Sequence, residues 1–151
     1  PPAAMGNVSK REARLEHRSE FVRAVGEYRA GHTRESRPYR PVEPAAAVTV
    51  HVRKRPIFER ELKRGEYDVV TALQPRIVVH DCRMQADLVR MYIDHVSFPF
   101  DNAFGEAATN EEVYMNTAAA LVPWCVDGGI STLFAYGQTG SGKTHTMEGA
   151  P

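Results

Sequence analysis

Hydrophobic residues near the start of the chain follow helical spacing over residues 9–29. Ser9 and Glu12, three residues apart, have the arrangement of a capping box, so we expect a helix from Ser9 to about Arg29. The apolar stripe is thin and clusters towards the second half, where we expect the helix to dock on a surface while the first half stays solvated. Its members are Leu15, Phe21, Val22, Val25 and Tyr28.

A linker and a strand are predicted next. Residues 32–44, HTRESRPYRPVEP, hold three prolines and no periodic pattern, which is typical of a linker. Beyond it, Val48, Val50 and Val52 alternate with other residues, which predicts a strand. We expect that strand to end near Pro56, because proline has no N–H to donate to a sheet.

Short elements follow, and glycine and proline residues mark their boundaries. Residues 58–65 predict one or two helical turns closed by Gly65, residues 67–81 two short strands around Pro75, and residues 96–104 another strand weakened by Pro99.

A second long helix is predicted over residues 109–129. Thr109 and Glu112 form another capping box, and Gly128 is placed to end the helix. Pro123 removes the hydrogen bond to the carbonyl of residue 119, so we expect a kink or an early end there. The stripe is formed by Val113, Thr117, Ala120, Leu121 and Trp124. A short apolar strand over residues 131–136 follows, and the alternation of strands and helices predicts an α/β fold.

Composition places the chain among soluble globular domains, with 42% hydrophobic and 25% charged residues. Residues 1–91 carry 18 Lys and Arg against 12 Asp and Glu, whereas residues 92–151 carry 1 against 7. The first part is therefore the better candidate for an acidic partner. Cys82 and Cys125 do not form a CxxC pair, and no signal peptide or membrane span is recognisable, so we expect an intracellular protein without a zinc site or disulfide framework.

The strongest chemical signal is GQTGSGKT at residues 137–144, a full match to the phosphate-binding pattern GxxxxGK[ST]. Glycines let the backbone N–H groups wrap around phosphate oxygens, and the helix that we expect to begin near Gly142 adds its positive end. In that pattern Lys143 reaches the β- and γ-phosphates and the Thr144 hydroxyl ligates Mg²⁺. The other members of the expected loop are Gly137, Gln138, Thr139, Gly140 and Ser141. The alternative to a phosphate-binding loop is a flexible turn with a solvated lysine.

The longer string FAYGQTGSGKTHTM resembles the nucleotide loop of kinesin motor domains. The resemblance extends back through FPFDNAF, TNEEVY and VRKRP, in the family's order, and covers residues 48–148. It implies the first part of a kinesin-like motor at 45–151, with a mixed sheet flanked by helices, behind a basic neck segment at 1–44 that is partly helical or disordered. The neck segment and the sequence VTVHVRKRP are most similar to the internal-motor kinesins, which disassemble microtubule ends.

The resemblance also implies nucleotide contacts outside the loop. The family's adenine-side motif RxRP falls on Arg53, Arg55 and Pro56, with Tyr114 and His145 as further neighbours of the nucleotide. Each has an ordinary alternative. If the resemblance is set aside, Arg53, Arg55 and Pro56 are interpreted as a solvated strand end. His145 is then an ordinary helix residue and Tyr114 a core tyrosine.

One loop departs from the internal-motor pattern. Where depolymerising kinesins carry a Lys-Val-Asp tip, the stretch RMQADLVR has Gln85, Ala86 and Asp87. The change from lysine to glutamine removes a positive charge that would face acidic tubulin. The alternative for this stretch is a solvated loop or a short helix.

The resemblance implies an ATP-driven microtubule motor in the complete protein, located in the cytoplasm on the cytoskeleton, with a homodimer as a possible state of that protein. Neither of the family's two switch loops occurs in residues 1–151, so we expect these residues to bind ATP and Mg²⁺ without turnover and to leave an incomplete, marginally stable sheet. A second hypothesis is a non-catalytic tubulin-binding module that uses the basic first part. A third hypothesis is a helicase. The sequence shows neither the aromatic residues that stack on nucleic acid nor the DExD-type motif of a helicase, so we expect no nucleic-acid partner. Since no membrane span is recognisable, we expect no membrane partner either.

Overall fold

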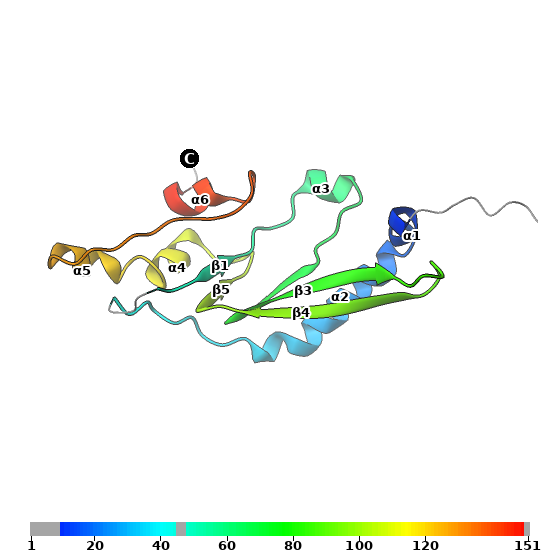
Figure 1. Cartoon of the computed structure of the whole chain (residues 1–151), viewed down its shortest axis with the longest axis horizontal. Helices are drawn as coiled ribbons and strands as arrows, with labels where there is room; N and C mark the ends of the chain where they lie inside the picture. Colours follow the sequence, from blue (N-terminus) through cyan, green and yellow to red (C-terminus); the bar gives the residue numbers. More distant parts are fainter. Residues whose placement is uncertain (1–9, 45–47, 150–151) are drawn as a thin grey trace, which may run out of the picture. The chain divides into compact units, whose positions relative to one another are not determined.

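The computed structural model describes residues 10–44 and 48–149, and the chain divides into two compact units (Figure 1). The first unit comprises residues 1–35, 57–71 and 78–98, and the second comprises residues 36–56, 72–77 and 99–151. Both units are therefore built from segments that are distant in the sequence.

The first unit combines helices with most of a three-stranded sheet of order β2-β3-β4. The strands are consecutive and β2 joins β3 through a two-residue turn, which is the connection of an antiparallel pair. The elements are α1 (Lys10–Glu16), α2 (Arg18–His32), the short 3₁₀ helix η1 (Thr33–Glu35), α3 (Glu59–Lys63), β2 (Val70–Leu73), β3 (Arg76–Met84) and β4 (Met91–Pro99).

The second unit is built around a parallel pair of three-residue strands. Residue 51 pairs with residue 102 and residue 53 with residue 104. The elements are β1 (His51–Arg53), β5 (Asn102–Phe104), α4 (Asn110–Met115), α5 (Leu121–Val126) and α6 (Lys143–Glu148). Together the two units confirm the predicted α/β class, with the strands arranged in two separate sheets.

The helix predicted from Ser9 to Arg29 is present as two helices that meet at His17. Ser9 itself lies outside the described residues, and α2 continues to His32. Phe21 and Val25 are buried against Cys82 and Met84 of β3, so the second half docks as expected. The first half is not wholly solvated, because Ala13 is buried in the same cluster.

Arg29 fastens α2 to the segment that leads into β2. Its Nε donates to Oγ1 of Thr71 at 2.9 Å, and its Nη2 donates to the carbonyls of Asp68 and Val70. An ion pair of 2.9 Å to the Asp68 carboxylate adds to these bonds. Helix α2 is thus held by directional bonds as well as by apolar burial.

The predicted linker has neither helix nor strand over residues 36–43, yet its backbone is held in the second unit. Asn102, fully buried in β5, donates to the carbonyl of Arg40 at 2.7 Å and accepts from the N–H of Arg40 at 2.9 Å. The ring of Tyr39 packs on Phe104, with 4.6 Å between ring centroids. Arginine and proline content alone gave no signal for this docking.

Two predicted elements are split, and each split has a local cause. The strand predicted over residues 96–104 is two strands in different sheets. Pro99 has no N–H, Phe100 donates to the carbonyl of Pro75, and Asp101 donates to that of Val50. The chain therefore changes partners between β4 and β5.

The helix predicted over residues 109–129 is α4 and α5, broken at residues 116–120. The capping box of Thr109 and Glu112 is confirmed. Pro123 occupies the first turn of α5, where its missing N–H costs nothing, whereas an unbroken helix would need that N–H. Gly128, at φ 92°, follows the end of α5 as expected.

The remaining predictions divide between right and wrong. The turns closed by Gly65 are α3, and the two strands around Pro75 are β2 and β3, joined across a cis peptide bond at Pro75. The strand near Val52 exists but spans only three residues. The strand predicted over residues 131–136 is absent: these residues have no regular secondary structure and belong to neither described sheet.

Candidate nucleotide-binding site

The glycine-rich loop at residues 137–144 has the backbone that its sequence predicts. Gly140 and Gly142 have φ values of 80° and 96°, in the left-handed region that favours glycine. A Cβ built on Gly137 would lie 2.6 Å from Oγ of Ser141, so only glycine fits there without a shift. Helix α6 begins at Lys143, within the last two residues of this stretch and directly after Gly142, as expected.

Lys143 is folded back over this loop. Its Nζ donates to the carbonyl of Gly137 at 2.8 Å and to that of Gln138 at 2.9 Å. A cation held against two loop carbonyls lies where it can exchange them for the oxygens of an anion. Thr144, the predicted magnesium ligand, is exposed at the start of α6. Compact glycines, a lysine and a hydroxyl are a residue set that fits a magnesium-bound polyphosphate.

Arg53, at the end of β1, connects the loop's helix to α4. Its Nη1 donates to Oδ1 of Asn110 at 2.5 Å and to Oγ1 of Thr146 at 3.1 Å, and its Nη2 donates to the carbonyl of Ala108 at 2.9 Å. Burial lowers the pKa of Arg53. The structure therefore places Arg53, one of the predicted adenine-side residues, in contact with Thr146 of α6.

The other predicted neighbours of the nucleotide are more exposed. Arg55 is half-buried and donates to the carbonyl of Pro56 at 2.9 Å. Tyr114 lies in α4 with 47% of its surface exposed, which argues against the alternative of a core tyrosine. His145 is exposed in α6, and its carbonyl accepts from Nδ2 of Asn110 at 2.8 Å. Their contact with a nucleotide stays a prediction.

Sequence reasoning missed Asn110 and Thr146. Neither belongs to a phosphate-binding pattern, and Asn110 reads simply as the residue after a helix cap. The only available signal was the position of Thr146 on the helix that follows the loop, three residues after Lys143. Both residues become relevant through the folded position of Arg53.

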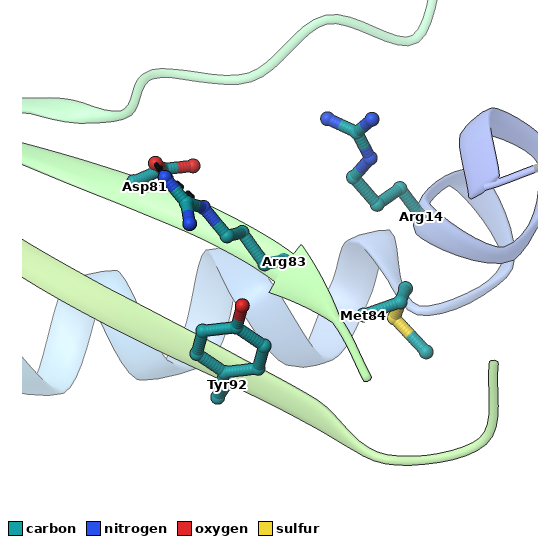
Figure 2. Close-up of a pocket in the computed structure, with 5 residues that line it drawn as sticks. All are labelled: Arg14, Asp81, Arg83, Met84 and Tyr92. Carbon is teal, nitrogen blue, oxygen red and sulfur yellow. Dashed lines mark hydrogen bonds and ion pairs between the residues drawn. The ribbon is translucent and has the colours of Figure 1, made fainter. Parts of the chain in front are cut away.

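A separate hollow of about 360 Å³ lies in the first unit and contains none of the predicted nucleotide residues. Arg14, Asp81, Arg83, Met84 and Tyr92 line it (Figure 2). The carboxylate of Asp81 accepts from Arg83, and this bond lowers the pKa of Asp81 and raises that of Arg83. The charges of Asp81 and Arg83 are thus paired with each other.

The stretch RMQADLVR forms the hairpin between β3 and β4, so the short-helix alternative is wrong. Asp87 accepts from the N–H groups of Val89 and Arg90 and from the Arg90 side chain. The Arg90 backbone contributes most to lowering the pKa of Asp87 to about 2. Leu88, at φ 56°, completes the turn. Asp87 therefore shapes this loop.

Two kinds of feature are absent from residues 10–44 and 48–149. They contain no group of three or more His, Cys, Asp or Glu side chains arranged to hold a metal ion. No helix in that part of the chain is long and apolar enough to cross a membrane.

The kinesin motor domain family model matches residues 53–151, which include β5 and the glycine-rich loop. The chain belongs to the kinesin motor domain family. The kinesin-like protein KIF24 from Homo sapiens and that from Mus musculus are each 47% identical to the chain over 103 residues. Those residues are 68% of the chain and 8% of each relative, so the match spans a small part of their length.

Solved kinesin structures share the fold. A dimer of KIF14 residues 391–772, bound to AMP-PNP and in complex with a microtubule, matches with a TM-score of 0.55 and 35% identity. That match covers 70% of this chain and 29% of the KIF14 chain. KIF14 residues 391–755 with ADP, also in complex with a microtubule, match with a TM-score of 0.53 and 36% identity, over 68% and 28% of the two chains.

Proposed function

We propose that residues 137–144 bind the phosphates of ATP, with Mg²⁺, as part of an ATP-hydrolysing microtubule motor. The observation that carries the proposal is the loop itself. Its glycines hold backbone conformations that other residues disfavour, and Lys143 already contacts two loop carbonyls. Family membership and the nucleotide in the KIF14 structures support the same assignment.

The chain's own residues would act by binding and orienting. Loop N–H groups would donate to phosphate oxygens, Lys143 would exchange its two carbonyl partners for phosphate oxygens, and the Thr144 hydroxyl would hold the metal. When bound, Mg²⁺ supplies neutralisation of phosphate charge. Arg55 and Pro56 are proposed to face the base, and Tyr114 and His145 to be further neighbours of the nucleotide. The rest of the catalytic apparatus would come from switch loops, whose sequence patterns are absent from residues 1–151.

In the full-length protein, hydrolysis is proposed to drive movement on microtubules or disassembly of their ends, in the cytoplasm. Depolymerisation is the less supported of the two, because Gln85 stands where the depolymerising pattern has lysine. A dimer is proposed by analogy with the KIF14 dimer that was solved on a microtubule.

The alternative of a basic tubulin-binding module loses its basis in the fold. The first unit holds 12 Lys and Arg against 12 Asp and Glu, and the second holds 7 against 7. The excess of positive charge along residues 1–91 is therefore balanced within each folded unit. We propose the motor function alone.

Lys143→Ala tests the proposal in the full-length protein that carries these residues. We expect ATP affinity to fall by about 100-fold or more, because hydrogen bonds from a charged donor are lost, and microtubule-stimulated ATP hydrolysis to disappear. Equilibrium titration with a fluorescent ATP analogue and a steady-state ATPase assay provide the measurements.

Lys63→Ala is the matched control, since Lys63 lies on α3 and pairs with the exposed Glu59 of the same helix. It should leave both quantities unchanged. Turnover in Lys143→Ala equal to that of the unaltered protein would refute the assignment.

A further inference from the structure

Arg53 is built into the second unit as a tie between three segments. Its guanidinium lies at the end of β1 and donates to Asn110 at the start of α4, to Thr146 in α6, and to the carbonyl of Ala108. Partial burial of the guanidinium carries a desolvation cost, which these three acceptors offset. A side chain engaged in this way has little freedom to turn towards another ligand.

The amide of Asn110 extends the tie to a second point on α6. Its Oδ1 accepts from Arg53, and its Nδ2 donates to the carbonyl of His145 at 2.8 Å. The orientation of this amide follows from its partners, because Arg53 can only donate and a carbonyl can only accept. Asparagine thus fits this position chemically, whereas aspartate would face the His145 carbonyl with an acceptor.

We infer that Arg53 and Asn110 are positioning residues that fix α6, and with it Lys143 and Thr144, for the triphosphate. The inference rests on the proposed function, and it reassigns Arg53 from the base to the helix that carries the phosphate-binding side chains. Both ends of the tie meet adjacent residues of a six-residue helix, His145 and Thr146. So short a helix depends on such contacts for a fixed orientation, because few internal hydrogen bonds hold it.

Asn110→Asp separates the two hydrogen bonds of the Asn110 amide, since it keeps an acceptor for Arg53 and removes the donor to the His145 carbonyl. Asn116→Asp is the matched control. Nδ2 of Asn116 also donates to a helix carbonyl, that of Glu112, at 2.8 Å, and the bond stays within α4 and its cap. Arg53→Lys is the second variant, because it retains the charge and loses the forked geometry.

Hydrogen exchange of residues 143–148 and binding of ATP and GTP would be measured in the full-length protein. For Asn110→Asp and Arg53→Lys we expect faster exchange in α6, unchanged exchange in β1 and β5, and a loss of about 10-fold in affinity that is equal for ATP and GTP. Asn116→Asp should change none of these. A loss of stability without a role in positioning would instead raise exchange throughout the unit and leave the affinity of the folded protein intact.

Two further results would overturn the inference. One is a loss specific to ATP in Arg53→Lys with wild-type binding in Asn110→Asp, which would assign Arg53 to the base. The other is unchanged exchange in α6 in both variants. Failure of the proposed function looks different, because the unaltered protein would then bind neither nucleotide, and exchange in α6 without nucleotide would still report whether the tie exists.

Discussion

Single side chains set the local geometry of both units. Asp87 holds the β3–β4 turn through the N–H groups of Val89 and Arg90, and Asn102 holds the backbone of Arg40 from both sides. In both places a short polar side chain replaces the hydrogen bonds that regular secondary structure would supply. A residue identified by motif can therefore have its main role in shaping the backbone.

His51 gives a prediction at this scale. Its Nδ1 is buried and has no hydrogen-bond partner among the described residues, and burial lowers its pKa while Asp101 acts in the opposite direction. Because the folded pKa lies below the unfolded value of about 6.5, the folded state binds its proton less readily. Stability is then complete above about pH 6.5 and falls as the pH drops towards the lowered pKa.

His51→Gln should flatten this fall, because glutamine does not titrate. Urea unfolding of the 151-residue chain between pH 7.5 and pH 5 can follow the fluorescence of Trp124, its only tryptophan, which belongs to the same unit. An identical loss of stability in the variant and in the unaltered chain would contradict the role given to His51.

At the scale of elements, the docking of α2 depends on two side chains buried against β3 and on Arg29, which bonds the segment at the start of β2. Phe21 is fully buried and stacks near Tyr67, with 6.3 Å between ring centroids. Phe21→Ala should destabilise the first unit by about 3 kcal/mol, because it leaves a cavity as well as removing apolar contact. Chemical denaturation followed by far-UV circular dichroism, with limited proteolysis in α2, measures the effect.

Val22 supplies the control for this experiment. It is the next residue in the same helix, and 45% of its surface is exposed. Val22→Ala should change stability by no more than about 0.5 kcal/mol. Equal effects of the two substitutions would mean that α2 does not dock as described.

At the scale of the whole molecule, the segment after α5 leaves large apolar side chains in solvent. The exposed fractions are 93% for Ile130, 78% for Phe134 and 97% for Tyr136. Exposed apolar surface of this kind favours association. The 151-residue chain should therefore self-associate as its concentration rises, and a variant with serine at all three positions should do so much less.

Sedimentation velocity over a range of concentrations tests this prediction. Val48→Ser is the comparison, because Val48 is 80% exposed but lies outside the segment. A chain that stays monomeric at high concentration, or a Val48→Ser variant that suppresses association as strongly as the triple variant, would show that residues 130–136 are not responsible.

The glycine-rich loop and the capped start of α4 were readable from the sequence because their causes are local. Gly140 and Gly142 adopt backbone angles that their own chemistry allows, and Thr109 meets Glu112 within one helical turn. The same holds for the turns closed by Gly65 and the hairpin around Pro75. Kinesin membership also followed from contiguous strings of residues, and the family match confirmed it.

Tertiary structure decided what depends on residues far apart in the chain. Arg53 meets Asn110 and Thr146, which lie 57 and 93 residues further along the chain, and residues 131–136 stay outside both described sheets although their apolar run predicts a strand. The charge asymmetry between the two halves of the sequence disappears in the folded units, because each unit draws segments from both halves. Local chemistry set the elements of this protein, whereas long-range pairing set their partners and their charge environment.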